Sequence, residues 1–94
     1  MKIVADMSLY PLKDGPIPTI IEFIEELQGR GGIEIVTNQL GTQLRGDFEA
    51  VTDAIKHCMR KAMMAPNTVV LVVKYLNIDV EIGRKPSLTP PITV

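Results

Sequence analysis

Three polar-tipped side chains alternate along a short run near the N-terminus: Asp6, Ser8 and Tyr10. If this run is a strand, its period of two puts all three on one face, about 6–7 Å apart. A carboxylate accepts hydrogen bonds, a serine hydroxyl donates and accepts them, and a tyrosine ring stacks on flat groups. The set therefore suits a small heteroaromatic molecule, and the alternative is the ordinary polar face of a half-buried sheet.

Asn38 and Thr42 flank a second segment of interest, Gln39 to Gly41, which is typical of a hairpin turn. Asparagine tolerates the left-handed backbone region that many turns use, and threonine favours strands. Taken alone, both residues are explained by turn chemistry.

The nucleophiles and bases of the chain form no catalytic pattern. His57 and Cys58 are neighbours on a predicted helix, so they point in different directions and do not make a Cys–His pair. One histidine and one cysteine are too few for a transition-metal site. The stretch from Gly29 to Gly32 lacks the spacing and the following helix of a phosphate loop. The sequence therefore predicts no enzyme activity, no metal and no cofactor.

The composition is that of an ordinary globular chain and argues against two classes of partner. Its 94 residues are 46% hydrophobic and 22% charged, with a net charge of −1. No block of Lys or Arg marks a nucleic-acid surface. The longest apolar run, Val69 to Val73, is too short to span a membrane, and the pattern of a signal peptide is missing. We expect a cytoplasmic protein whose lone Cys58 forms no internal disulfide.

The elements that position these residues follow from hydrophobic periodicity. Residues 2–10 alternate as a strand, and residues 17–28 have helical spacing. This helix has two possible starts, a capping box formed by Thr19 and Glu22 or Pro18 at the first helical position. Its predicted buried stripe is Ile20, Phe23, Ile24 and Leu27.

The second half of the chain repeats the alternation of strand and helix. Residues 33–37 and 42–45 are predicted strands, and the Asp47 carboxylate is the predicted N-cap of a helix that runs to about residue 64. The predicted buried stripe of this helix is Phe48, Val51, Ile55, Cys58 or Met59, and Ala62. A final strand over residues 68–82 would reach roughly 45–50 Å, so it bends, breaks or pairs with another subunit. Residues 83–94 are predicted to be an irregular tail.

The element order is β-α-β-β-α-β, which predicts one α+β domain over residues 1–94. The crossover rule favours a ferredoxin-like sandwich, with a four-stranded antiparallel sheet and both helices on one face. The other face carries too many apolar residues to meet water. We expect it to pack against a second sheet.

Three segments in this order resemble a known family. They are residues 8–12 (Ser-Leu-Tyr-Pro-Leu) at the end of the first strand, residues 37–42 (Thr-Asn-Gln-Leu-Gly-Thr) at the hairpin, and Gly46-Asp47 at the start of the second helix. Together they resemble the thiamine/hydroxymethylpyrimidine-binding family, the YkoF-like proteins, over about residues 1 to 80. Single-domain relatives often have a charged segment where residues 77–82 continue here as a predicted strand.

The resemblance implies a non-enzymatic protein that binds thiamine or its hydroxymethylpyrimidine part for carriage or salvage. It also implies that a second copy of the chain covers the sheet, as a dimer or as a homotetramer built from dimers. By position, the ligand-binding role falls on Ser8, Tyr10, Asn38 and Thr42, and the shared face of the first strand adds Asp6.

The chemistry of the implied ligand agrees with these residues. An aminopyrimidine presents ring acceptors and an amine donor, and the Asn38 amide offers both kinds of group. A thiazolium cation suits the Tyr10 ring and the Asp6 charge. Because the chain has few cations, we expect a preference for unphosphorylated ligand. The rival functions are a regulatory ferredoxin-like module for an amino acid or a nucleotide, and an enzyme of the same architecture.

Overall fold

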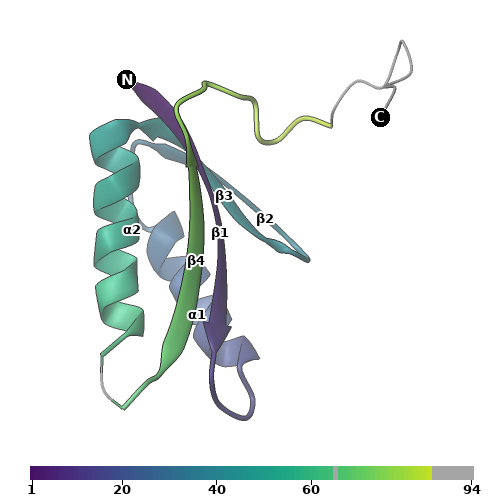
Figure 1. Ribbon diagram of the computed structural model, residues 1–94, viewed down its shortest axis with the longest axis vertical. Helices are drawn as coiled ribbons and strands as arrows, with labels where there is room; N and C mark the ends of the chain where they lie inside the picture. Colours follow the sequence, from purple (N-terminus) through teal and green to yellow (C-terminus); the bar gives the residue numbers. More distant parts are fainter. Residues whose placement is uncertain (65, 86–94) are drawn as a thin grey trace.

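The central strand of the sheet is β1 (Lys2–Pro11), which hydrogen-bonds to neighbours on both of its edges. The structure is a computed structural model that describes residues 1–64 and 66–85. The other elements are α1 (Ile17–Gln28), β2 (Ile33–Asn38), β3 (Gly41–Asp47), α2 (Phe48–Ala62) and β4 (Val69–Leu76). The strand order is β2-β3-β1-β4, and every pair is antiparallel. This is the predicted ferredoxin-like βαββαβ fold (Figure 1).

Alternation along β1 divides the molecule into two sides. Ile3, Ala5 and Met7 are buried and pack with Leu44 of β3 and with the helices. We call this the helix side of the sheet. The opposite side, which we call the outer face, carries the even-numbered residues of β1. Residues 83–85 of the predicted tail have no helix or strand, and residues 86–94 lie outside the described residues.

Both helices place an apolar stripe on the same side of the sheet. The buried helix residues are Phe23 and Leu27 of α1 and Val51, Ala54, Ile55 and Cys58 of α2. Cys58 is therefore in the core as expected, and burial raises the pKa of its thiol. Phe48, which was predicted to join this stripe, is 41% exposed because it lies at the very start of α2.

The start of α1 differs from one of the two predicted alternatives. The helix begins at Ile17 after Pro16, without a hydrogen bond from any capping side chain, so the Thr19–Glu22 capping box does not form. Pro18 lies in the first turn, at the second helical residue rather than the first. A proline is tolerated there because the N–H that it lacks has no partner within the helix.

The start of α2 is held by a contact that is distant in sequence. Asp47 has the extended backbone of an N-cap, but its carboxylate makes no capping hydrogen bond and lies 3.6 Å from Lys2 Nζ. The Phe48 N–H instead donates to the Met1 carbonyl oxygen at 2.8 Å. The prediction of a side-chain cap was wrong because the Asp47 carboxylate lies beside Lys2 and does not accept from the first N–H groups of the helix.

The last strand is shorter than the predicted span of residues 68–82. β4 ends at Leu76, which pairs with Val4 near the start of β1, so little of the neighbouring strand remains beyond this point. The chain then crosses toward β2 and β3. Arg45 Nε donates to Asp79 Oδ1 at 2.7 Å, and a methyl group placed at Gly83 would lie 3.9 Å from Val36 Cγ2. We call residues 77–83 the crossing segment.

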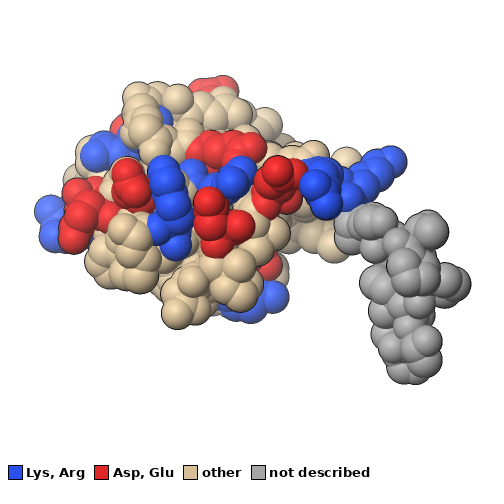
Figure 2. All heavy atoms as spheres, turned by 90° about the horizontal axis from the view of Figure 1, so that it is seen from above, with Lys and Arg blue, Asp and Glu red and all other residues tan. Residues whose placement is uncertain are grey.

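The outer face combines apolar and charged groups. Val70, Val72 and Leu76 of β4 lie on this side and are 43%, 48% and 40% exposed. Seen along the sheet from one end, acidic and basic side chains alternate on the surface (Figure 2). In the described part of the chain, no helix is long and apolar enough to cross a membrane.

Replacing Leu44 by alanine tests the assignment of the core. Leu44 is fully buried against both helices, so Leu44→Ala should lower the free energy of unfolding by about 2–5 kcal/mol. The measurement is urea denaturation followed by circular dichroism. Leu12→Ala is the matched control because Leu12 is 61% exposed, and its effect should stay within about 0.5 kcal/mol. Equal losses in the two variants would contradict this core.

Candidate functional site

A hollow on the outer face brings together four of the five residues that sequence analysis selected. It has a volume of about 410 Å³, and its lining includes Asp6, Ser8, Tyr10 and Asn38. Leu40, Gln43, Val72 and Lys74 complete the lining. We call this hollow the outer pocket. Its size falls within the range of roughly 300–1,000 Å³ that small-molecule sites occupy.

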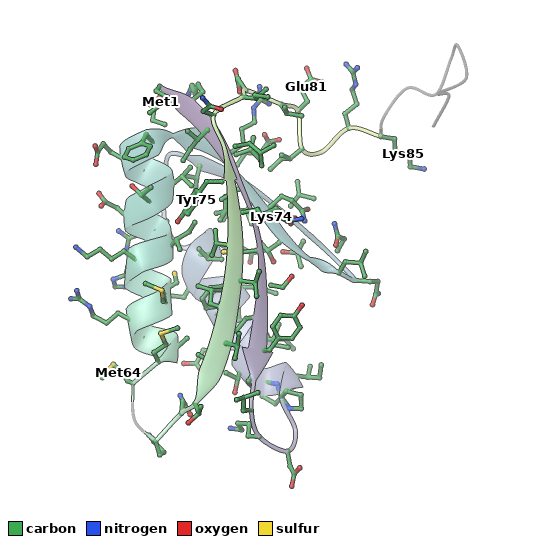
Figure 3. The ribbon with its side chains drawn as sticks, viewed as in Figure 1. Met1, Met64, Lys74, Tyr75, Glu81 and Lys85 are labelled. Carbon is green, nitrogen blue, oxygen red and sulfur yellow. The ribbon has the colours of Figure 1, made fainter. Side chains whose placement is uncertain are left out.

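A row of polar side chains crosses all four strands at this pocket. Asn38 of β2 donates from Nδ2 to Gln43 Oε1 of β3 at 3.1 Å. Gln43 Nε2 donates to Asp6 Oδ1 of β1 at 2.9 Å, and Lys74 Nζ of β4 lies 3.3 Å from Asp6 Oδ2. We call these four residues the polar row. In Figure 3, Lys74 and Tyr75 leave β4 in opposite directions, as neighbours on a strand must.

The charge of the polar row is concentrated at Asp6. The hydrogen bond from Gln43 holds the pKa of this carboxyl below its ordinary value, and Lys74 acts in the same direction against the effect of burial. Asp6 is therefore ionised at neutral pH and neutralised by Lys74. Among the residues that the structure describes, the pocket consequently presents a paired charge and no free cation.

The hairpin at the rim of the pocket is fixed by one side chain of its own, Asn38 of β2, and by one from the neighbouring strand, Ser8 of β1. Asn38 Oδ1 accepts from the Leu40 N–H at 2.9 Å and from the Gly41 N–H at 3.1 Å. Ser8 Oγ donates to the Leu40 carbonyl oxygen at 3.1 Å. Turn chemistry thus occupies part of the hydrogen-bonding capacity of Asn38, and Ser8 ties the hairpin to β1.

Thr42 lies on the helix side of the sheet, away from Asp6. It is 6% exposed, and its hydroxyl lies 3.2 Å from that of Thr37, its partner across the hairpin. It lines a second hollow of about 250 Å³, whose lining also includes Ser8, Tyr10 and Asn38. Ile20, Phe23 and Ile24 of α1 lie on the far wall. Ser8, Tyr10 and Asn38 thus border both hollows, whereas Asp6 and Thr42 each border one.

Three residues of the site were missed in the sequence. Gln43 and Lys74 complete the polar row, and Gly41 allows the hairpin to approach β1. A two-residue turn pairs Asn38 with Gly41, which places Gln43 on the face of Asn38 and Thr42 on the opposite one. That register was the available signal for Gln43. Lys74 has no such signal, since its position opposite Asp6 depends on how β4 pairs with β1.

A second titratable cluster lies on the helices. His57 Nε2 is 3.0 Å from Glu26 Oε1, and Lys61 Nζ is 2.9 Å from Glu26 Oε2. Hydrogen bonds from Lys61 and His57 lower the pKa of Glu26. His57 is exposed as expected, and its partner is a carboxylate on α1. Across residues 1–64 and 66–85, no three acidic, histidine or cysteine side chains are grouped to hold a metal ion.

Fold and site define a ferredoxin-like domain with a small-molecule-sized pocket on its helix-free face. Over residues 2–79 the chain matches the YKOF-related family. The protein therefore belongs to the YKOF-related family, as its sequence motifs indicated. The sequence matches none of the curated proteins with which it was compared.

Solved structures share the fold at low sequence identity. Protein SP2199 of Streptococcus pneumoniae is 24% identical with a TM-score of 0.77, and the match covers 85% of this chain and 90% of that one. A domain of unknown function, DUF77, from Bacillus cereus is 20% identical with a TM-score of 0.70, covering 87% and 84%. A candidate thiamine biosynthesis/salvage protein of Thermotoga maritima is 19% identical with a TM-score of 0.64, covering 96% and 95%.

Adding a methyl group at Gly41 tests the close approach of the hairpin to β1. A Cβ atom at this position would lie 2.6 Å from the Met7 carbonyl oxygen and 3.0 Å from Ser8 Oγ, so the backbone must shift. Gly41→Ala should lower the free energy of unfolding by about 1–3 kcal/mol, measured by urea denaturation. The matched control is Gly31→Ala, whose Cβ would meet nothing within 4 Å. A Gly41→Ala variant as stable as this control would disprove the close approach.

The charge of Asp6 predicts how stability depends on pH. Because folding lowers the pKa of Asp6, its stabilising effect is present above the unfolded value of about 3.9 and is lost as the pH falls through the folded value. Asp6→Asn should therefore be less stable than the natural chain near neutral pH, and the difference should shrink in acid. Urea denaturation between about pH 7 and pH 2 measures this difference. A difference that stays constant down to the lowest pH would contradict the assignment.

Proposed function

We propose that this protein binds thiamine or its hydroxymethylpyrimidine part in the outer pocket and does not transform it. The observation that carries the proposal is the convergence of Asp6, Ser8, Tyr10 and Asn38 on one hollow of small-molecule size. Membership of the YKOF-related family supports a thiamine-related ligand. The shared fold of the candidate thiamine biosynthesis/salvage protein of Thermotoga maritima points in the same direction.

The walls of the pocket suit a flat, polar-edged ring. Tyr10 is 53% exposed, so its ring has a free face on which a heteroaromatic group can stack. Val72 provides an apolar surface beside it, and Ser8 and Asn38 provide polar atoms at the rim. Since Lys74 is already paired with Asp6, the pocket has no unpaired cation for a pyrophosphate. We therefore expect an unphosphorylated ligand to bind better.

The electrostatics of the pocket support binding without turnover. A general base works best when its pKa lies near the operating pH. Asp6, the carboxylate of the outer pocket, has its pKa shifted in the opposite direction by Gln43 and Lys74. It is therefore a weak base that positions charge and hydrogen bonds. This agrees with a role in carriage or salvage, and we propose the cytoplasm as the place of that role.

A second copy of this chain is the partner that we propose for the outer face. Val70 and Val72 of β4 are exposed apolar residues on this face, and Tyr10 pairs with Val70. Leu76 adds a third, on the other side of Lys74. Asp6 and Lys74 lie next to each other in the middle of this surface, so their opposite charges can face the same pair in a symmetry-related copy. Stacking two sheets in this way would cover the outer pocket and shield a bound ring from water. Dimers of this kind could assemble further into a homotetramer.

Binding measurements on matched tyrosine variants test the proposed site. Thiamine and hydroxymethylpyrimidine should raise the melting temperature of the protein, whereas amino acids and nucleotides should not. Tyr10→Ala should weaken binding about five- to tenfold in calorimetry, as expected for loss of an aromatic contact of about 1 kcal/mol. Tyr75→Ala is the control, because Tyr75 has the same 53% exposure but lies on the helix side of the sheet.

Several results of this experiment would count against the proposal. Stabilisation by an amino acid or a nucleotide alone would favour a regulatory module. Equal losses in the two tyrosine variants would remove the outer pocket as the site. Tighter binding of thiamine diphosphate than of thiamine would contradict the preference for unphosphorylated ligand. Native mass spectrometry would report the number of subunits and any retained molecule, and a ligand-free monomer that stays monomeric with thiamine would exclude the stacked dimer.

A further inference from the structure

The hairpin leaves Asn38 with hydrogen-bond donors only. Both lone pairs of Oδ1 are used, because this atom accepts from the Leu40 and Gly41 N–H groups at 2.9 and 3.1 Å. One hydrogen of the Nδ2 group is used as well, in the bond to Gln43 Oε1 at 3.1 Å. What remains for a ligand is the second N–H of the amide. The turn therefore removes the acceptor that the sequence analysis attributed to Asn38.

The orientation of this amide is fixed from a second direction by the polar row. An ionised carboxylate only accepts hydrogen bonds, so the nitrogen of Gln43 must be the atom that faces Asp6 at 2.9 Å. The oxygen of Gln43 then faces Asn38 and accepts its N–H. The turn and the polar row require the same orientation of the Asn38 amide. Exchanging its oxygen and nitrogen would break the bonds to Leu40 and Gly41 and the bond to Gln43.

Ser8, in contrast to Asn38, is left with hydrogen-bond acceptors only. Its single hydroxyl hydrogen is donated to the Leu40 carbonyl oxygen at 3.1 Å. The lone pairs of Oγ remain available, so Ser8 meets a ligand as an acceptor. Leu40 is thus bound by both residues, through its N–H to Asn38 and through its carbonyl to Ser8. This shared partner holds the free donor and the free acceptor at the same hairpin.

We infer that Asn38 and Ser8 together select a ligand edge on which an acceptor stands next to a donor, such as a ring nitrogen beside an exocyclic amine. The N–H of Asn38 binds the ring nitrogen, and Ser8 Oγ accepts from the amine. Asp6 and Gln43 are positioning residues that act through Asn38. This inference rests on the proposed function and goes further, because it names the edge of the ring that is read and the atoms that read it.

Ligand analogues test this inference in the intact protein. The probes are 4-amino-5-hydroxymethyl-2-methylpyrimidine, its two pyridine analogues in which one ring nitrogen becomes C–H, and its dimethylamino analogue. Only the ring nitrogen adjacent to the amine belongs to the selected edge. The pyridine that lacks this nitrogen and the dimethylamino compound should each bind about five- to twelvefold more weakly in calorimetry, since a lost hydrogen bond costs about 1–1.5 kcal/mol. The other pyridine should bind nearly as well as the parent pyrimidine.

An isosteric change at Asn38 links the discrimination to its N–H. Asn38→Asp keeps an oxygen that accepts from Leu40 and Gly41, so the turn is retained, but the free donor is lost. This variant should bind the parent pyrimidine weakly and should no longer distinguish it from the pyridine. Glu34→Gln is the matched control on the outer side of β2, outside the polar row, and should discriminate like the natural chain.

The positioning role of the row has its own measurement. Gln43→Leu removes both hydrogen bonds of this side chain, so it should reduce the discrimination between pyrimidine and pyridine and shift the Asn38 side-chain amide signals in the NMR spectrum. Unchanged discrimination and unchanged amide signals in this variant would overturn the positioning role.

The results separate this inference from the proposed function. Pyrimidine binding without discrimination among the analogues would overturn the selected edge and leave the proposed function in place. If the Asn38→Asp variant still distinguished the pyrimidine from the pyridine, other residues would recognise the selected edge and the role of Asn38 would be overturned. Failure of every pyrimidine and of thiamine to bind would overturn both.

Discussion

The structure depends on the position of β1 between β3 and β4. A strand that is paired on both edges has no freedom to change register, because a slip of one residue would send Ile3, Ala5 and Met7 to the outer face. The same constraint sends Asp6, Ser8 and Tyr10 outward. Burial of one half of the strand therefore fixes the direction of the other half. The polar groups of the outer pocket are positioned by the hydrophobic core behind them.

The turn of the hairpin between β2 and β3 is held to β1 by polar contacts rather than by burial. The Asn38 side chain accepts from the Leu40 N–H within the turn, and Ser8 donates to the Leu40 carbonyl oxygen. Gly41 allows the turn to approach β1 closely. Its tip is highly exposed, since Leu40 is 88% exposed. In such an environment hydrogen bonds of modest strength determine the conformation. The side chains that we propose to recognise the ligand, Asn38 and Ser8, therefore also determine the conformation of the hairpin.

Much of this arrangement could be predicted from local patterns. The alternation of residues along the chain identified β1 and its outward-facing residues Asp6, Ser8 and Tyr10. The order of the helices and strands identified the fold. The errors concern contacts between distant segments. The Phe48 N–H donates to the Met1 carbonyl oxygen, which is distant in sequence. β4 ends at Leu76 because few residues of β1 remain beyond Val4 to pair with it. Thr42 was grouped with Asn38 because the two flank the turn, although the register places them on opposite faces. Local hydrophobic periodicity contains no information about which distant residue an N–H group or a strand will pair with.

The crossing segment has a consequence for the symmetry of any assembly. Asp79 is bound to Arg45, so this segment lies over one end of the outer face. Gly83 lies against Val36, the partner of Gln43 in the sheet, so the segment reaches the border of the outer pocket. The two ends of the sheet are therefore inequivalent as contact surfaces. A second sheet that docks on this side must be displaced along the strands, away from residues 77–83. Changes in the length of this segment among homologues would then alter the offset between subunits, and with it the shape of the space enclosed above Tyr10.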